Sequence, residues 1–377
     1  MSTPEYVVVG AGLFGSVIAE RIADRLQRTV LVVDKRTEVG GNCHSTEDSE
    51  TGIEYHTYGT HIFHTSSSEA WDYIRRFTDF NGYHHQVLTV HRGSVYQMPI
   101  NLETINAFYG KHFRPAEARE FIAAEIAAAG ITKPRNLEEK AISLVGRPLY
   151  EAFIRGYTIK QWRTDPRELP AEIITRLPVR FDYREDYFTD ALRQGIPLRG
   201  YTAVFERLLS SPLIETRLGC DFLTNREQLP FNRQLIFSGP IDGYFDSSLG
   251  PLQWRSVRQE KKIVEEGDFQ GTSVMNYADL DVPFTRIHEP RHLHPERSYP
   301  SDRTVIFYET PSDDPSEPLY PVKTRRNLEL LKRYRELASR ESHVVFGGRL
   351  GDYAYYDMDK TILRALECFE KEIAPFS

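Results

Sequence analysis

The first 34 residues contain the feature that most restricts how this chain can fold. The run YVVVG at 6–10 is a continuous apolar strand of the kind that is buried on both faces of a parallel sheet. SVIAERIADRL at 16–26 places apolar residues at helical spacing, and TVLVVD at 29–34 is a second buried strand. Strand, helix and strand in this order predict a βαβ unit and therefore an α/β domain.

A glycine motif, Gly10-Ala-Gly12-Leu-Phe14-Gly15, lies between the first predicted strand and the helix. Here Gly10 permits a tight turn, Gly12 lets a pyrophosphate approach the backbone, and Gly15 lets the helix pack closely on the strand. The free N–H groups at the helix start would face the phosphates. Asp34, 24 residues after Gly10, is near the distance expected for a ribose-binding acid. The stretch predicts a dinucleotide site, although a tight turn without a ligand has the same local pattern.

A second pair of glycines, Gly40 and Gly41, follows the acid in VVDKRTEVGGNCHS at 32–45. A nicotinamide-binding fold has no obvious use for this pair. An acid followed closely by Gly-Gly resembles the extended fingerprint of FAD proteins of the two-dinucleotide-binding type. The resemblance implies that the pair lets the backbone pass beside the flavin end of an extended FAD. We therefore expect FAD rather than NAD, with predicted contacts in these segments at Gly10, Gly12, Phe14, Gly15, Asp34, Lys35, Gly41 and Asn42.

The composition argues against several classes of partner. The net charge is −7 and the basic residues are dispersed, whereas non-specific nucleic-acid binding needs a concentrated cationic face. Three well-separated cysteines suggest neither a disulfide framework nor a zinc site, and they fit a reducing compartment. There is no signal-peptide pattern, and the apolar stretch at 121–131 is too short to span a bilayer. We expect a cytoplasmic protein that binds no metal, nucleic acid or membrane.

With 377 residues the chain is long enough for two or three domains. Apolar strand patterns return at QLIFSGPID and HVVFGG, so we expect a discontinuous FAD-binding Rossmann-like domain at 1–80, 200–245 and 340–377. Apolar residues recur three to four apart in the region 100–162, which predicts an inserted helical domain. Short alternating segments such as SVMNYAD and TVIFYET predict an antiparallel sheet domain that binds substrate, at 81–99, 163–199 and 246–339.

Several longer stretches narrow the chemistry: TYGTHIFHT at 57–65, GYTIKQW at 156–162, ITRLPVRFDYREDYF at 174–188 and GGRLGDYAYYDMD at 347–359. With GGN, VPFTRI at 282–287, YPV at 320–322 and KRYRELASRE at 332–341, they make the whole chain similar to bacterial UDP-galactopyranose mutases. The resemblance implies that UDP-galactopyranose and UDP-galactofuranose are interconverted without net redox change. Reduced flavin N5 would attack the anomeric carbon while UDP leaves. It further implies bacterial surface-glycan synthesis, a homodimer, and an electron donor such as NAD(P)H or a flavin reductase.

The resemblance assigns the substrate site to arginines and aromatic residues. Arg176 of TRLPVR and Arg286 of FTRI correspond to the arginines that grip the diphosphate, where fixed cations favour the departure of UDP. The other implied contacts are phosphate-binding tyrosines, an aromatic pair at the uracil and a histidine near the nucleotide: Tyr187, Tyr320, Tyr355, Tyr157, Trp162 and His85. Without the motifs, such side chains are more often solvated ion-pair partners or core residues.

The flavin end of the implied site involves two histidines and the C-terminal segment. The resemblance places His61 beside the flavin and His64 near the substrate, both with catalytic roles. A metal pair on one helical face and plain structural histidines are alternatives, but no further metal ligand lies at suitable spacing. Asp357 is expected to cap the last helix, whose positive end would stabilise the reduced flavin. The contacts implied in this segment are Arg349, Tyr356, Asp357 and Met358.

The proline-rich segment at about 163–183 is expected to be a mobile loop that closes over the substrate. Arg163, Thr60 and His85 depart from the wording most common in the family. No motif supports a Ser-His-Asp or Cys-His arrangement, and Cys43 is expected to be a buried thiol rather than a redox centre. Two other classes stay open: a flavin oxidoreductase of the amine-oxidase or desaturase type, and a flavin-bound structural or regulatory protein without catalysis.

Overall fold

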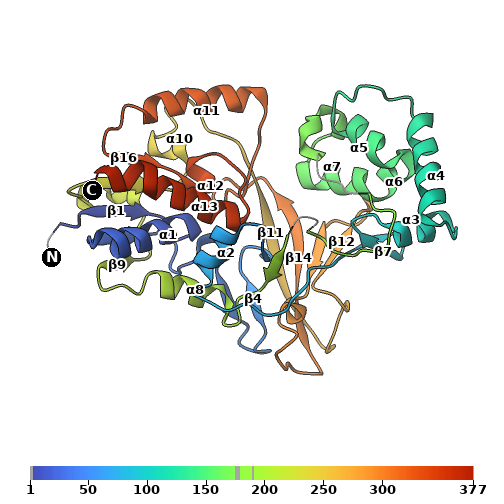
Figure 1. Ribbon diagram of the computed structural model, residues 1–377, viewed down its shortest axis with the longest axis horizontal. Helices are drawn as coiled ribbons and strands as arrows, with labels where there is room; N and C mark the ends of the chain where they lie inside the picture. The colour runs from blue at the N-terminus through green and yellow to red at the C-terminus, as the bar shows by residue number, and fades with distance from the viewer. Residues whose placement is uncertain (1–2, 175–178, 189–190, 377) are drawn as a thin grey trace.

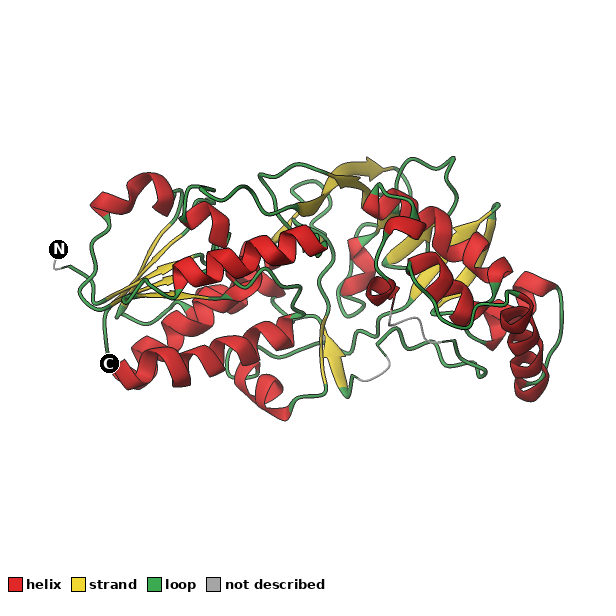
Figure 2. Ribbon diagram, turned by 90° about the horizontal axis from the view of Figure 1, so that it is seen from above, coloured by secondary structure: helices red, strands yellow, loops and turns green. Residues whose placement is uncertain are grey.

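The computed structural model describes residues 3–174, 179–188 and 191–376. A parallel sheet with its helices lies at one end of the molecule, helices α3–α7 lie at the other, and a larger sheet lies between them (Figure 1). Seen from above, the parallel sheet and its helices again lie at the end that carries both termini (Figure 2). In the described part of the chain, no helix has both the length and the apolar character needed to cross a membrane.

Five short strands form a wholly parallel sheet in the order β16–β10–β1–β2–β9. Their bounds are Val344–Phe346, Gln234–Phe237, Tyr6–Val9, Val30–Val33 and Ile214–Arg217. The βαβ prediction is confirmed, because β1 and β2 pair in parallel and α1 (Leu13–Arg21) connects them. The side chains of β2 are buried on both faces, as expected for an internal strand of a parallel sheet.

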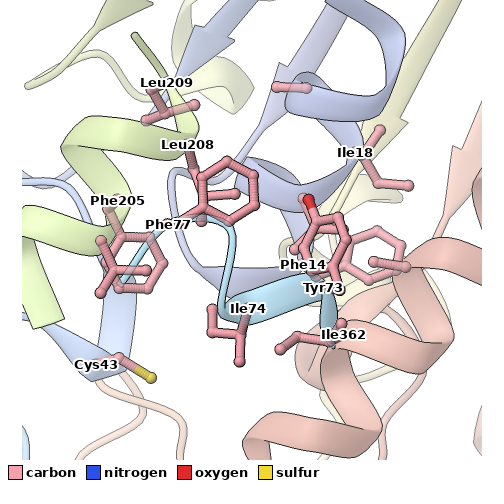
Figure 3. Close-up of a cluster of buried hydrophobic side chains, with 14 of the residues drawn as sticks. Phe14, Ile18, Cys43, Tyr73, Ile74, Phe77, Phe205, Leu208, Leu209 and Ile362 are labelled. Carbon is pink, nitrogen blue, oxygen red and sulfur yellow. The ribbon is translucent and has the colours of Figure 1, made fainter. Parts of the chain in front are cut away.

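The helices around this sheet come from both ends of the chain. Helix α1 packs against the C-terminal helix α13 (Met358–Cys368) and against α8 (Gly200–Leu208), and α2 (Ser68–Ile74) joins the same core. Figure 3 shows Phe14, Tyr73 and Ile362 converging from α1, α2 and α13. The other helices of this half are α9, α10, α11 and α12, at Phe222–Asn225, Ile241–Tyr244, Arg325–Ala338 and Gly348–Gly351.

The central sheet has seven strands in the order β15–β11–β14–β13–β12–β6–β7. Their bounds are Tyr320–Pro321, Trp254–Val264, Thr304–Ser312, Arg286–His288, Val274–Tyr277, Val87–His91 and Ser94–Met98. The predicted sheet is mixed rather than purely antiparallel, because β12 and β6 pair in parallel. These two strands are joined by a long connection that includes the helical region, which permits a parallel pairing that a hairpin does not.

The remaining described strands form two small antiparallel ribbons. They pair β3 (Ser45–Glu47) with β4 (Glu54–His56) and β5 (Phe63–Thr65) with β8 (Arg193–Gly195), both antiparallel.

The helical region contains α3, α4, α5, α6 and α7, at Leu102–Tyr109, Pro115–Ala128, Leu137–Val145, Arg147–Leu149 and Gly156–Trp162. Local sequence determines where two of these helices begin. The side chain of Asn101 accepts a hydrogen bond from the Thr104 N–H at the start of α3, and Asn136 accepts one from Glu139 at the start of α5. The region has its own apolar core, so it packs around itself and not only against the central sheet.

Candidate active site

One cleft of about 1680 Å³ runs from the glycine turn after β1 to the face of the central sheet and the end of α7. Sites for a single small molecule are typically about 300–1,000 Å³ in volume. The cleft therefore has room for two ligands, one at the parallel sheet and one at the central sheet.

The glycine turn at the first end has the geometry of a dinucleotide site. Gly10 has φ +106°, which favours glycine, and a Cβ at Gly15 would lie 2.0 Å from the Gly10 carbonyl oxygen. Helix α1 starts at Leu13 with Gly12 in the N-cap position and without a capping side-chain hydrogen bond from the described residues. Its first N–H groups therefore remain available for an anion.

The second glycine pair packs directly on this turn, a neighbour that the sequence did not identify. The Gly40 N–H donates to the Ala11 carbonyl at 2.9 Å, and a Cβ at Gly41 would lie 2.9 Å from the Gly12 Cα. Both glycines have positive φ, 105° and 55°. Because neither glycine has a side chain, the two backbone segments can lie in close contact. Together they form this wall of the cleft.

The acid after β2 orients the glycine turn. Asp34 accepts the Ala11 N–H at 2.7 Å and the Arg36 N–H at 2.9 Å, and it lines the cleft. Lys35 is exposed, and its ammonium donates to the Ser316 carbonyl at 3.3 Å.

The sequence predictions did not include Arg36, whose side chain connects several residues at the nucleotide end of the cleft. Its guanidinium lies 3.8 Å from the centre of the Tyr58 ring, donates to Asn42 Oδ1 at 3.2 Å and pairs with Glu317. The fixed cation is therefore held beside the predicted nucleotide contacts. In the sequence, only the position of Arg36 next to Lys35 pointed to this role. That position is equally typical of an ordinary surface residue.

His61 lies in the loop before β5 and His64 lies within β5, so the two do not share a helical face and the helical metal-pair geometry is wrong. His61 Nδ1 lies 2.6 Å from the Gly59 carbonyl oxygen, which can only accept. Burial lowers the pKa of His61 to about 4, the hydrogen bond to Gly59 opposes this shift, and the Arg349 charge adds to it. The ring is therefore neutral, with the proton on Nδ1 and Nε2 left as an acceptor.

The next part of the wall is aromatic. The His64 ring stacks on Phe188 with centroids 3.6 Å apart, and His85 and Tyr187 pack around the same phenylalanine. His85 is buried, which lowers its pKa to about 3, and its Nδ1 lies 2.9 Å from the Tyr83 hydroxyl. Phe188 is not among the predicted site residues, but it contacts three that are: His64, His85 and Tyr187. The four rings form one surface.

A row of polar side chains crosses the floor of the cleft. In the sheet register, Gln259 of β11 faces Glu309 of β14, Glu309 faces Arg286 of β13, and Arg286 faces Asn276 of β12. Cross-strand neighbours on one face lie close enough to bond. Gln259 donates to Glu309 at 3.1 Å, Arg286 lies 3.5 Å from Glu309, and Arg286 Nε donates to Asn276 at 3.2 Å. The register thus fixes the orientation of Arg286.

Charge is balanced within this row. Burial alone would raise the pKa of Glu309, but Arg286 and the hydrogen bonds from His288 and Gln259 lower it to about 2. Burial alone would lower the pKa of Arg286, but Tyr157 and Glu309 raise it. Both groups are therefore ionised at neutral pH, and Arg286 is a fixed cation at the cleft.

Helix α7 is locked onto the central sheet, which places its aromatic residues at the cleft. A Cβ at Gly156 would lie 2.2 Å from the Ala278 carbonyl oxygen, so the helix approaches as closely as glycine permits. The Lys160 ammonium lies 2.8–3.1 Å from four backbone carbonyls, those of Tyr277, Asp279, Val282 and Phe284. Tyr157 and Trp162 on this helix both line the cleft.

The C-terminal segment closes the far side. Tyr320 and Tyr355 stack with centroids 5.4 Å apart, and the Arg349 guanidinium lies over the Tyr355 ring. Arg349 also donates to the Leu319 carbonyl at 2.7 Å. Tyr356 and Met358 line the cleft, and the Tyr356 hydroxyl donates to Asp352.

Asp357 is the N-cap residue of α13, but the prediction that its carboxylate caps the helix is wrong within the described residues. Thr361 instead donates its N–H and its hydroxyl to the Asp357 carbonyl oxygen, at 2.9 and 3.0 Å. Asp357 lines the cleft. In the first turn of α13 the Lys360 N–H donates to Asp359 Oδ1 at 2.7 Å, so this carboxylate offsets part of the positive end of the helix.

Arg176 lies outside the described residues, so the structure gives it no position. The described flanks of the predicted loop are anchored. Arg163, with φ 48°, ends α7 and pairs with Asp313 at 3.0 Å, and Leu169 and Ile174 are buried in the helical core.

The cleft has polar atoms suited to ligands. Tyr157 Oη, Gln161 Oε1 and Arg349 Nε are buried and have no hydrogen-bond partner among the described residues. Buried polar atoms are nearly always paired in native structures, so a group without a partner at a cleft indicates a site for a bound molecule. Together with the open turn of α1, these atoms fit a long, polar, anionic cofactor and a second polar ligand.

Comparisons with known proteins agree with this geometry. A family profile described as UDP-galactopyranose mutase matches residues 152–355, and one described as an NAD(P)-binding Rossmann-like domain matches residues 8–77. A Klebsiella pneumoniae protein named "Probable UDP-galactopyranose mutase" is 39% identical over 97% of this chain and 94% of its own.

Two further comparisons extend this result. An Escherichia coli dTDP-fucopyranose mutase is 38% identical over 96% of both chains. The crystal structure of a reduced UDP-galactopyranose mutase superimposes with a TM-score of 0.73 at 16% identity, covering 98% of this chain and 95% of its own. The structural match supports the predicted fold, in which a Rossmann-like domain is combined with helical and sheet parts.

Proposed function

The chain belongs to the UDP-galactopyranose mutase family, and we propose that it interconverts UDP-galactopyranose and UDP-galactofuranose. A mutase of this kind is an isomerase. The observation that supports the proposal most strongly is the 39% identity with the Klebsiella protein along 97% of the chain. The cleft agrees with it, because a nucleotide-type turn lies at one end and an arginine-centred polar row at the other.

Family membership implies a flavin, and we propose FAD. Gly10, Gly12 and the open start of α1 would hold the pyrophosphate, and Asp34 would hold the ribose. Asn42, His61, Arg349 and the start of α13 would face the flavin ring. When bound and reduced, the flavin supplies N5 as the nucleophile that attacks the anomeric carbon as UDP leaves.

Arg286 would stabilise the negative charge that develops on the departing diphosphate. It suits this role because the sheet register fixes its side chain before the substrate arrives, so little reorganisation is needed. Arg176 and the hydroxyls of Tyr187, Tyr320 and Tyr355 would bind the same phosphates. Neutral His61 would lie beside the flavin, and His64 would lie beside the sugar.

Tyr157 and Trp162 would form the uracil site. A base stacked on an aromatic side chain gains about 1–3 kcal/mol. His85 would contact the nucleotide nearby. We further propose that the segment 163–183 closes over the bound nucleotide-sugar, that the enzyme works as a homodimer in surface-glycan synthesis, and that NAD(P)H or a flavin reductase supplies the electrons.

A second candidate is a dTDP-fucopyranose mutase, because the E. coli protein of that name is nearly as similar as the Klebsiella one. The two substrates differ at the base, at the 2′ position of the ribose and at C6 of the sugar. The same ring chemistry would apply to both.

A single assay tests these proposals. Purified protein is reduced with dithionite and incubated separately with UDP-galactofuranose and with the furanose form of dTDP-fucose, and the sugar nucleotides are separated by chromatography. We expect the pyranose product from the UDP-sugar, with no net oxidation of flavin or sugar. Preferential conversion of the dTDP-sugar would favour the second candidate, and stoichiometric flavin oxidation would favour an oxidoreductase.

The assay has a matched pair of variants. Arg286→Lys keeps the charge but loses the planar fork, and it should lower kcat by about 100-fold, within the range measured for loss of one transition-state donor. Arg325→Lys, at a 93% exposed side chain on α11, should leave the rate unchanged.

A further inference from the structure

Three side chains form a hydrogen-bonded chain from the cleft into the protein. The Thr60 hydroxyl lies 2.8 Å from His288 Nδ1, and His288 Nε2 lies 3.0 Å from Glu309 Oε2. All three side chains line the cleft, where Thr60 is half-buried and His288 and Glu309 are 4% and 3% exposed. None of the roles proposed above uses Thr60 or His288.

The direction of each hydrogen bond follows from the end of the chain. Glu309 is ionised and can only accept, so His288 Nε2 donates to it. When the imidazole is neutral, Nδ1 is then an acceptor, and the Thr60 hydroxyl donates to it. Hydroxyl, imidazole and carboxylate stand in the order of the serine-hydrolase triad, in which the hydroxyl can pass its proton inward.

The sheet holds this chain in place. Arg286 and His288 are two residues apart on β13, so their side chains lie on the same face. Glu309 faces Arg286 across the strands and is also bound by Gln259, so the carboxylate cannot rotate away from His288 without losing both partners. Thr60 lies in the loop between β4 and β5.

The proposed reaction needs a proton to move. A pyranose ring is closed through O5 and a furanose ring through O4, so each conversion of pyranose to furanose removes the O4 proton and places one on O5. The departure and return of UDP break and form the bond between C1 and the diphosphate oxygen, and they move no proton of a sugar hydroxyl. Arg286 cannot accept a proton because it stays charged.

We propose that Thr60, His288 and Glu309 form a proton relay for the ring-changing half of the mutase reaction. Thr60 Oγ1 accepts the O4 proton as its own proton passes to His288 Nδ1, and Glu309 stabilises the resulting imidazolium. The proton then returns through Thr60 to O5. On the sugar the C1–O5 and O4–H bonds are broken and the C1–O4 and O5–H bonds are formed, and the three side chains end as they began. The relay rests on the proposed function, and it runs in reverse for the opposite conversion.

Isotope exchange separates the two halves of the reaction. Reduced protein is given UDP-galactofuranose labelled with ¹⁸O at the oxygen that joins the sugar to the diphosphate. Scrambling of the label reports departure and return of UDP, and chromatography of the same sample reports ring interconversion. The measured quantity is the ratio of interconversion to scrambling.

Thr60→Val keeps the shape of the side chain and removes the hydroxyl. We expect it to lower this ratio by about 100-fold or more, the size of a lost general acid–base contribution. Thr60→Ser should restore the ratio to within about tenfold of the original protein. An unchanged ratio in Thr60→Val would overturn the relay, and so would a failure of Thr60→Ser to recover it.

A matched control uses a second hydroxyl on the same carboxylate. Thr285 donates to the Glu309 carbonyl oxygen at 3.1 Å and lies 3.4 Å from its Oε1, and it does not line the cleft. Thr285→Val should leave the ratio unchanged even if it lowers stability. A fall equal to that of Thr60→Val would mean that any loosening of Glu309 has the same effect, and it would exclude the relay.

A second readout does not depend on turnover. In protein labelled with ¹⁵N-histidine, the NMR signals of His288 should show a proton on Nε2 and none on Nδ1, and Thr60→Val should shift the Nδ1 signal. A proton on Nδ1 in the unmodified protein would overturn the relay. If the unmodified protein neither scrambles nor interconverts the substrate, the proposed function fails together with the relay's role, whatever hydrogen bonds the NMR signals report.

Discussion

The two sheets that form the cleft contribute to it in different ways. The inner strands β1 and β2 of the parallel sheet are apolar on both faces, and groups that line the cleft lie in the loops beyond their ends. The central sheet contributes side chains from one face, in a row that crosses β11, β14, β13 and β12 at one register. At the parallel sheet a ligand would contact mainly backbone groups of the loops, and at the central sheet it would contact side chains of the strands.

This difference has a physical origin. Backbone N–H groups bind phosphate wherever glycine lets the chain come close, so such a site depends on a few neighbouring residues. A charged side chain such as Arg286 must be held by partners of opposite charge, and in a sheet these partners come from adjacent strands. Substitutions at the parallel sheet should therefore lower stability and binding through steric clashes. Substitutions at the central sheet should do so by leaving a buried charge without its partner.

The largest effect is expected from Gly15→Ala. The new Cβ would lie 2.0 Å from the Gly10 carbonyl oxygen, and backbone on both sides prevents relief. We expect the protein to lose the flavin and to unfold at a temperature at least 10 °C lower, as recorded by absorbance and calorimetry. Gly82→Ala is the control, since no atom lies within 4 Å of its Cβ and its φ is not positive. Equal losses in both variants would refute the steric explanation.

The second effect tests the charged row. Arg286→Met leaves Glu309 buried without its cation, and breaking a buried pair costs about 3–5 kcal/mol. We expect about 3 kcal/mol in denaturant unfolding, because the Arg286 side chain is 30% exposed. Adding Glu309→Gln should recover part of the loss. If the double variant is less stable than Arg286→Met by the full cost of a second independent mutation, the two residues are not coupled.

Acid should act on the same row. The Glu309 pKa is lowered in the folded protein, so its charge stabilises the fold above the ordinary glutamate pKa of about 4.3, and this contribution is lost as pH falls toward 2. We expect the original protein to lose more stability than Glu309→Gln between pH 5 and about pH 2. Parallel stability curves for the two proteins would contradict this prediction.

A smaller effect is expected where α7 meets the central sheet. Lys160→Met removes the donor shared by four backbone carbonyls, and we expect about 2 kcal/mol of destabilisation. We also expect weaker UDP binding, because α7 carries Tyr157 of the proposed uracil site. Lys371→Met is the control, because its ion pair with Glu367 is exposed to solvent and screened, so its loss should leave stability almost unchanged. Calorimetry of both proteins with and without UDP gives the comparison.

The smallest effect concerns Cys43, next to the second glycine pair. Burial raises its pKa to about 12, so almost no thiolate exists at pH 7. We expect a thiol reagent to modify half-buried Cys220 first and Cys43 only after unfolding, as followed by mass spectrometry. Rapid modification of Cys43 in the folded protein would show that this wall of the cleft opens.

Local sequence patterns predicted the core of the parallel half of the molecule. The glycine turn, Asp34 and the apolar strands are local patterns, because turn geometry and burial on both faces constrain residues that are close in sequence. The helices at 102–162 were predictable for the same reason, since Asn101 and Asn136 act on the helices that follow them.

Only the tertiary structure decided the rest of the candidate site. Gln259, Asn276, Arg286 and Glu309 meet because four strands pair in one register, and a shift of one residue would turn each strand's side chains to the other face. Thr60 reaches His288 across 228 residues of chain, so no motif could reveal a hydroxyl–imidazole–carboxylate arrangement there. The spacing of residues within one segment does not show which segments pair. The pairing of distant segments determines where the charged and hydrogen-bonding side chains of the site lie.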